Sequence, residues 1–287
     1  MYIRKIDNYS TKPKYDTKNK NVTFGTNYKG FPDWINASIN ETCNLKCHYC
    51  PNSFLPKPVK EHLFPMDLYK KLLSCLQKID YNGIFCFHRY NEPLLTRKAE
   101  EYIEFANKYI PEAETRLYTN GMFLTKERLE SIKSAGGLKT IIVTEHTPLK
   151  SFIERISTLD ESLLENIFVR RAQDMHLVNR GGLMKGQREL RTKNLPCGMP
   201  ARNLVFDSYG NAIFCPDDYY KNIIVGDLKK QTPIEIVESK EFQSVSQALL
   251  RGERDRFPVC ANCNRENSVK ESDKIPAIEF IKANNNR

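Results

Sequence analysis

The stretch ETCNLKCHYCPNS, residues 41–53, places Cys43, Cys47 and Cys50 in a CxxxCxxC pattern. It follows a short apolar run, WINASI at 34–39, that is typical of a β-strand. Three thiolates at this spacing suit three corners of a cubane iron-sulfur cluster and leave one iron open to a ligand from outside the chain. A structural zinc site would need a fourth ligand, for which His48 is the candidate. The stretch therefore predicts a metal-binding loop at the end of a strand.

Composition and charge limit the class of protein. The 287 residues are 40% apolar, enough for one large domain and a small one. We find no run near the roughly 20 apolar residues of a membrane span, and no secretion signal at the start. We therefore predict a cytoplasmic protein without a membrane partner, whose nine cysteines are reduced and bind metal where they cluster.

The formal charge of +9 suits a phosphorylated or nucleotide-linked substrate. Part of this charge lies in a basic N-terminal extension. Because no basic platform with interleaved aromatic residues follows it, a small molecule is favoured over nucleic acid as the partner.

Short apolar strands alternate with amphipathic helices after the cysteine loop. Strands are expected at 34–39, 83–88, 115–119, 138–145 and 166–172, and helices at 66–79, 97–110, 126–135 and near 159–165. This order favours right-handed parallel crossovers and a closed or partly closed α/β barrel. The chemistry of such a barrel sits at the carboxyl ends of its strands.

The alternation stops near residue 190. LVFDSYGNAIFC, 204–215, predicts a β-hairpin, and 228–250 reads as helical. We therefore expect four regions, namely a basic extension at 1–33, a barrel at 34–190, a small second domain at 191–275 and a tail at 276–287.

A second set of cysteines falls in this smaller domain. Cys197 and Cys215 flank the predicted hairpin strands, and Cys260 and Cys263 form a CxxC pair. Four thiolates suit a fully ligated tetrahedral site. Their spacing alone leaves zinc and an iron-sulfur cluster as alternatives.

The first cysteine loop also resembles a known family. CNLKCHYC, 43–50, is similar to the CxxxCxΦC signature of radical S-adenosylmethionine (SAM) enzymes, with Tyr49 at the aromatic position. The resemblance implies a partial (β/α)6 TIM barrel and a [4Fe-4S] cluster whose open iron binds SAM. In this family the cleavage of SAM yields a 5′-deoxyadenosyl radical that takes a hydrogen atom from substrate, and an external donor such as flavodoxin or ferredoxin supplies the electron.

Three further segments resemble the SAM-binding motifs of that family. YNEPLL, 90–95, resembles the GEP motif with Asn91 in place of glycine; YTNG, 118–121, and TEH, 144–146, fall at the ends of the next two strands. The alternative for each is ordinary turn chemistry. The resemblance implies as SAM-binding residues Tyr49, Asn91, Glu92, Pro93, Thr119, Asn120, Gly121, Thr144 and Glu145.

The second cysteine set resembles the SPASM extension of such enzymes, in the shortened twitch form with one auxiliary [4Fe-4S] cluster. VNRGG, 178–182, is similar to the segment that bridges barrel and extension. This layout implies oxidation of a sugar or aminocyclitol alcohol to a ketone, with the auxiliary cluster taking up the electron. Arg180 and Asp217 lie where such enzymes place groups that bind or deprotonate substrate. A surface ion pair and a hairpin turn are the alternative.

Other reactions stay open at this point. Cys86 has the same strand parity as His88, so its thiol could return a hydrogen atom to a substrate radical, as in an epimerase; packing in the core is the alternative. A sugar dehydratase, a peptide-modifying maturase and a non-catalytic metal-binding protein are the remaining hypotheses. The short stretch before the first strand has no room for a packed peptide-recognition domain, which favours a small substrate.

Overall fold

A computed structural model of the chain describes residues 14–16, 21–23, 31–55, 62–146, 148–175, 177–184, 195–265 and 274–284. In the predicted extension, β1 (Lys14–Asp16) and β2 (Asn21–Thr23) form an antiparallel pair. The rest of residues 1–30, and much of the predicted boundary near 190, lie outside the described residues.

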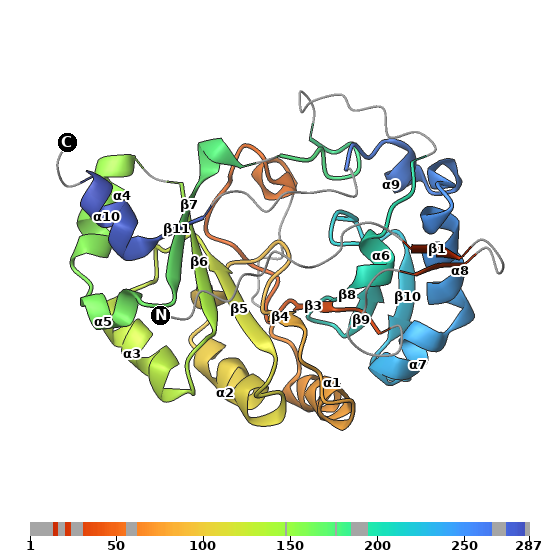
Figure 1. The fold of residues 1–287 in the computed structure, drawn as a ribbon, viewed down its shortest axis with the longest axis horizontal. Helices are drawn as coiled ribbons and strands as arrows, with labels where there is room; N and C mark the ends of the chain where they lie inside the picture. Colours follow the sequence, from red (N-terminus) through yellow and green to blue (C-terminus); the bar gives the residue numbers. More distant parts are fainter. Residues whose placement is uncertain are drawn as a thin grey trace.

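A curved nine-stranded sheet forms the centre of the molecule (Figure 1). Its order is β10-β9-β8-β3-β4-β5-β6-β7-β11, in which the stretch from β8 to β7 is parallel. The strands are β3 (Trp34–Ala37), β4 (Ile84–Cys86), β5 (Glu114–Thr119), β6 (Thr140–Glu145), β7 (Ile167–Arg171), β8 (Asn203–Phe206), β9 (Asn211–Ile213), β10 (Ile224–Asp227) and β11 (Ile275–Pro276). The described strands do not close into a ring, so the predicted partial α/β barrel is confirmed in its open form.

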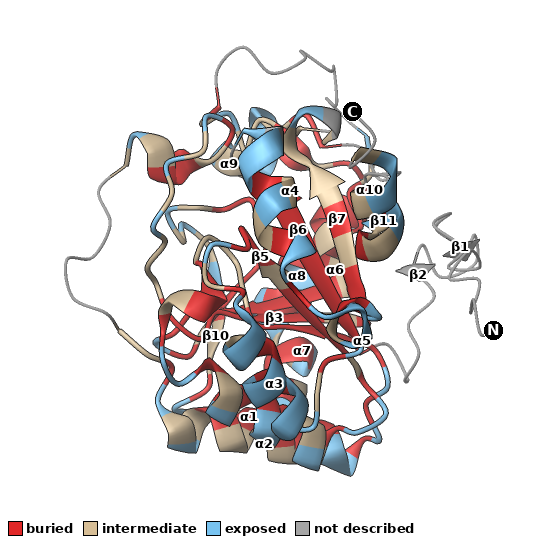
Figure 2. Cartoon of the chain, turned by 90° about the vertical axis from the view of Figure 1, so that its left-hand side faces the viewer, coloured by how far each residue is buried: buried red, intermediate tan, exposed pale blue. Residues whose placement is uncertain are grey.

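Helices cover the outer face of this sheet (Figures 1 and 2). In α1, for example, Leu72 and Leu76 are buried, as the spacing of apolar residues predicts, and Tyr69 is buried beside them. The barrel helices are α1 (Met66–Lys78), α2 (Ala99–Tyr109), α3 (Lys126–Ser134), α4 (Leu149–Ser157) and α5 (Glu161–Leu164). The structure adds α4 to the expected set. None of the helices in the described part of the chain has both the length and the apolar character that a bilayer crossing requires.

The C-terminal part extends the barrel sheet. The predicted hairpin is β8 with β9, and β8 pairs in parallel with β3, with Ile35 opposite Leu204. The remaining helices are α6 (Met199–Arg202), α7 (Pro233–Glu238), α8 (Lys240–Leu250), α9 (Pro258–Ala261) and α10 (Ala277–Asn284). In Figure 1 the orange loop after β3 and the blue α9 both lie on the upper side, away from α1 and α2. The two cysteine sets therefore belong to the same side of the molecule.

Candidate functional site

The first three cysteines line a cavity at the carboxyl end of the parallel sheet. Its volume is about 270 Å³, several times the ~30 Å³ that one water occupies. Two hydrogen bonds fix the loop above the strand ends, because Asn120 Nδ2 donates to Asn44 Oδ1 at 2.9 Å and Asn52 Nδ2 donates to the Tyr90 carbonyl at 2.7 Å. The loop thus holds its thiols over the ends of β4 and β5, as its place after the first strand predicts.

A histidine that the spacing did not single out lies beside this loop. His146 Nδ1 is 3.6 Å from Cys47 Sγ and 3.1 Å from the Tyr49 hydroxyl, and the two rings stack. Burial and the charge of Arg170 lower the pKa of His146 to about 4. His48, the candidate fourth zinc ligand, is exposed and contacts the edge of the Tyr49 ring.

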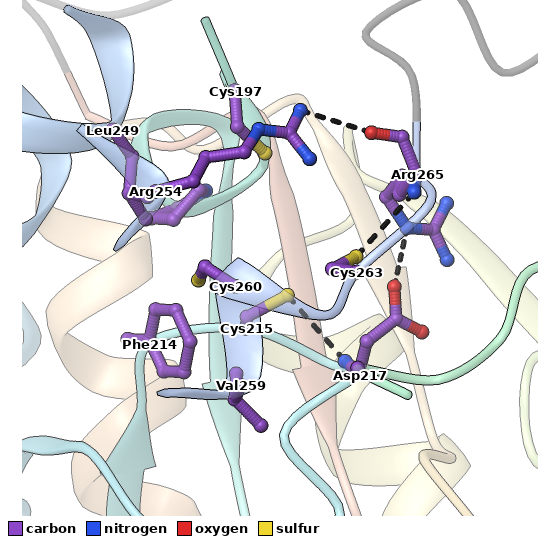
Figure 3. A pocket seen from close by; sticks show the side chains of 12 residues that line it. Cys197, Phe214, Cys215, Asp217, Leu249, Arg254, Val259, Cys260, Cys263 and Arg265 are labelled. Carbon is purple, nitrogen blue, oxygen red and sulfur yellow. Dashed lines mark hydrogen bonds and ion pairs between the residues drawn. The ribbon is translucent and has the colours of Figure 1, made fainter. Parts of the chain in front are cut away.

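The second cysteine set surrounds a smaller pocket (Figure 3). Cys197, Cys215, Cys260 and Cys263 line it together with Phe214, Leu249 and Val259. Two backbone N–H groups donate to the sulfurs, from Asp217 to Cys215 Sγ and from Arg265 to Cys263 Sγ, both at 3.4 Å. Such bonds to thiolate sulfur are a known means of tuning iron-sulfur clusters.

The two thiol sets present the sulfur ligands that iron-sulfur clusters take. Among the described residues, no three His, Cys, Asp or Glu side chains converge closely enough to bind one metal ion. Burial and the neighbouring Cys50 and Cys43 raise the pKa of Cys47 to about 11. Binding of iron must therefore displace its proton.

Glu92 connects the ends of two strands. Its carboxylate is 2% exposed and accepts hydrogen bonds from Thr119 Oγ1 at 2.8 Å, the Asn120 backbone at 2.8 Å and the Leu94 backbone at 3.0 Å. Burial raises the pKa of Glu92, and these donors oppose that rise. The resemblance predicts a contact with SAM, and the structure adds a second task, which is to hold the ends of β4 and β5 together beneath the cavity.

Replacement of Glu92 by Gln should therefore lower stability as well as SAM affinity. The amide NH2 would face a donor now bonded to the carboxylate, which leaves that donor unsatisfied at a cost of about 1–3 kcal/mol. We expect both the free energy of unfolding, by denaturant titration, and SAM affinity, by equilibrium binding, to fall. Glu112→Gln, at an exposed position, is the matched control. A loss of SAM affinity without any loss of stability would contradict the role in joining the strands.

The remaining predicted SAM contacts divide into two groups. Six side chains line the cavity, and these are Tyr49, Asn91, Glu92, Thr119, Asn120 and Thr144. Pro93, Gly121 and Glu145 are not among its lining residues. Gly121 shapes the turn instead, with φ of +73° and a position where a Cβ would lie 2.6 Å from Val143 Cγ1. Glu145 lines a separate hollow on the other side of the cysteine loop.

Several cavity residues were not among the predicted SAM contacts. His88, Arg89, Tyr90 and Arg170 all line it, and Arg170 Nη2 donates to Thr144 Oγ1 at 2.9 Å. Burial, with Arg170, Arg180 and Arg116, lowers the pKa of His88 to about 3. His88 ends the second predicted strand and Arg89 follows it, so the strand-end rule places both on the side of the molecule where the chemistry is expected. Cys86 is fully buried and is not among the residues that line the cavity.

Arg180, which is half-buried, and Asp217, which is buried, form an ion pair between the two sites. Arg180 lines the larger cavity and Asp217 the cysteine pocket, and Arg180 Nη1 lies 2.9 Å from Asp217 Oδ1. Arg265 binds the other oxygen of Asp217 (Figure 3). Burial alone would raise the pKa of Asp217, but Arg265 and Arg180 hold it well below its usual range. Asp217 therefore stays a carboxylate that joins the two sites.

Comparison with known proteins gives matches to both regions. The sequence model of the radical SAM superfamily matches residues 38–164, and that of the SPASM iron-sulfur cluster-binding domain matches 197–264. The S-adenosyl-L-methionine-dependent 2-deoxy-scyllo-inosamine dehydrogenase of Niallia circulans is 31% identical over 80% of this chain and 92% of its own length. A GTP 3',8-cyclase of Aliarcobacter butzleri is 30% identical over 47% of this chain and 42% of its own length.

The fold has solved counterparts as well. A crystal structure of BtrN in complex with AdoMet and 2-DOIA matches with a TM-score of 0.75 and 31% identity, covering 85% of this chain and 96% of that one. Selenomethionine BtrN in an open conformation matches with a TM-score of 0.64 and 27% identity, over 82% and 93% of the two chains. The two family-model ranges, 38–164 and 197–264, contain the two cysteine sets.

Proposed function

Because this chain belongs to the radical SAM superfamily and carries a SPASM iron-sulfur domain, we propose that it oxidises an alcohol carbon of a hydroxylated small molecule to a ketone. It is an enzyme of the oxidoreductase type, and its cofactors are SAM and iron-sulfur clusters. The observation that carries the proposal is the pairing of two thiol sites. A three-cysteine cavity open to ligands adjoins a pocket lined by four cysteines, and the Arg180–Asp217 pair lies between them.

The residues present fit two clusters. Cys43, Cys47 and Cys50 would hold the SAM-binding cluster, and Cys197, Cys215, Cys260 and Cys263 the auxiliary one. When bound, the first cluster with SAM supplies hydrogen-atom abstraction, and the second supplies an acceptor for one electron. Oxidation of an alcohol to a ketone removes one hydrogen atom, one electron and one proton. The first cluster with SAM would account for the hydrogen atom, the auxiliary cluster for the electron, and a proton acceptor for the proton.

The protein's own residues would orient the alcohol. His88 is neutral at ordinary pH, and its Nδ1 has no hydrogen-bond partner among the described residues. A neutral imidazole presents one acceptor and one donor nitrogen, so this ring suits a substrate hydroxyl. Arg180, which lines the same cavity, would also bind the substrate, and Asp217 would hold Arg180 in position through their ion pair.

The electron that starts each turnover must come from outside the chain, and we propose flavodoxin or ferredoxin as the donor. Lys46 and His48 line the same hollow as Glu145, and both are adjacent to Cys47 in the sequence. The cationic Lys46 suits an acidic partner. We place the protein in the cytoplasm, because the thiols that bind the clusters must stay reduced.

The proposal is tested with anaerobically reconstituted enzyme, SAM and dithionite against a panel of cyclitols and hexoses. A substrate deuterated at the reacting carbon should transfer deuterium into 5′-deoxyadenosine, and the product should be two mass units lighter than the unlabelled alcohol. Mass spectrometry of both products is the measurement. A product of unchanged oxidation state would contradict dehydrogenation and favour epimerisation, for which Cys86 lies outside the cavity lining.

A further inference from the structure

The cavity that would receive substrate is rich in positive charge. Arg89, Arg170 and Arg180 all line it, and Glu92 is the one acidic residue among the described lining side chains. The carboxylate of Glu92 already accepts three hydrogen bonds from the protein. Glu92 supplies one negative charge against the three guanidinium groups.

Two of these arginines share one wall of the cavity. The guanidinium carbons of Arg89 and Arg180 lie 5.0 and 5.9 Å from the centre of the Tyr90 ring. Arg89 also donates to the Asp218 carbonyl, which fixes its head group beside the C-terminal segment. Neither Arg89 Nε nor Arg180 Nε, both buried, has a hydrogen-bond partner in the part of the chain that the structure describes. Buried donors of this kind normally have a partner, and a bound ligand is one source of it.

Asp217 does not neutralise this wall. Its single negative charge is shared by Arg180 and Arg265, so this triad keeps a net positive charge before Arg89 is added. The low pKa of His88 has burial as its main cause, and three arginines add to it in the same direction. Counted over protein side chains, the lining of the cavity therefore carries more positive than negative charge.

We propose that the substrate carries an anionic group, a phosphate or a carboxylate, that Arg89 and Arg180 bind. The two planar guanidinium groups offer paired N–H donors, the arrangement that recognises oxyanions with two parallel hydrogen bonds. The dehydrogenase of Niallia circulans is named for an inosamine, a molecule with an amino group. An ammonium group at this wall would be repelled. This inference rests on the proposed function, and it names the class of substrate that the cavity admits.

The test measures binding to the holoenzyme with SAM bound and without reductant. Four hexoses serve as probes, namely glucose 6-phosphate, glucuronate, glucose and glucosamine, with inorganic phosphate as a fifth. We expect the two anionic hexoses to bind at least tenfold more tightly than glucose and glucosamine, and inorganic phosphate to compete with them. The preference for phosphate or for carboxylate identifies the anion. Arg89→Gln should weaken anion binding by tenfold or more, and Arg97→Gln, at an exposed position, should leave it unchanged.

Arg89→Gln leaves the Arg180–Asp217 pair in place, so the variant is expected to fold. Its iron content and its circular dichroism spectrum should match the wild type. Iron content and reductive cleavage of SAM are also measured for the wild-type protein, because their absence there would overturn the proposed function itself and not only the anionic substrate. Tighter binding of glucosamine than of glucose 6-phosphate, or no binding of any anionic probe up to 10 mM, would overturn the anionic substrate.

Discussion

Simultaneous replacement of Cys43, Cys47 and Cys50 by alanine is expected to abolish reductive cleavage of SAM. Wild-type protein reconstituted under anaerobic conditions should contain about eight irons, from two cubane clusters, and the variant about four. Loss of one outer-shell partner of a metal site typically costs about 10–100-fold, so loss of all three ligands should lower the rate by more than ~10³-fold. Iron analysis and release of 5′-deoxyadenosine are the measurements.

The second cluster should survive this change because its ligands come from other elements. Cys197 precedes α6, Cys215 follows β9, and Cys260 and Cys263 lie at α9. Cys75→Ala is the matched control, since this buried thiol belongs to α1 on the outer side of the sheet. Loss of all iron from the triple variant would show that the two sites are not independent. Zinc in place of iron in wild-type protein would refute both cluster assignments.

The sequence was most informative where the chemistry imposes a fixed spacing. CxxxCxxC and the four later cysteines led to both thiol sites, because a cluster restricts which residues can ligate it and how far apart they lie. Periodicity predicted α1 and the parallel strands, because burial of one face repeats every few residues. Glu92 was also found, although its three bonds within the protein depend on how β4 and β5 come together.

Contacts between distant segments were beyond sequence reasoning. The pairing of β8 with β3 makes the C-terminal hairpin part of the barrel sheet, and strand order is a property of the whole fold. Arg170 reaches the cavity from the end of β7, and His146 reaches Cys47 across 99 positions. Sequence motifs predicted Arg180 and Asp217 as site residues separately. Their joint position between two pockets appears only when both domains are assembled.

The auxiliary site should be needed for oxidation and dispensable for SAM cleavage. Alanine at both Cys260 and Cys263 should reduce the iron content to about four and leave the Cys43 loop intact. We expect formation of ketone to fall by more than ~10²-fold, because the substrate electron loses its acceptor, while 5′-deoxyadenosine is still released. The ratio of 5′-deoxyadenosine to ketone should therefore rise from one to well above one, as measured by quantitative mass spectrometry.

Loss of these ligands could also unfold the C-terminal segment, because metal binding and folding are coupled. Circular dichroism separates the two effects, and Cys260→Ser, which keeps a ligand atom of similar size, provides a milder variant. Cys260→Ser should retain iron but change the reduction potential of one cluster. If that cluster accepts the substrate electron, the ratio of 5′-deoxyadenosine to ketone should change as well. If the metal site is purely structural, that ratio should stay the same. Normal yields of ketone from the double alanine variant would exclude the auxiliary cluster as the electron acceptor.

In D2O, the oxidative reaction should place no solvent deuterium at the reacting carbon, and Cys86→Ala should not alter the product. Deuterium at that carbon, together with its loss in Cys86→Ala, would instead identify an epimerase that uses the Cys86 thiol.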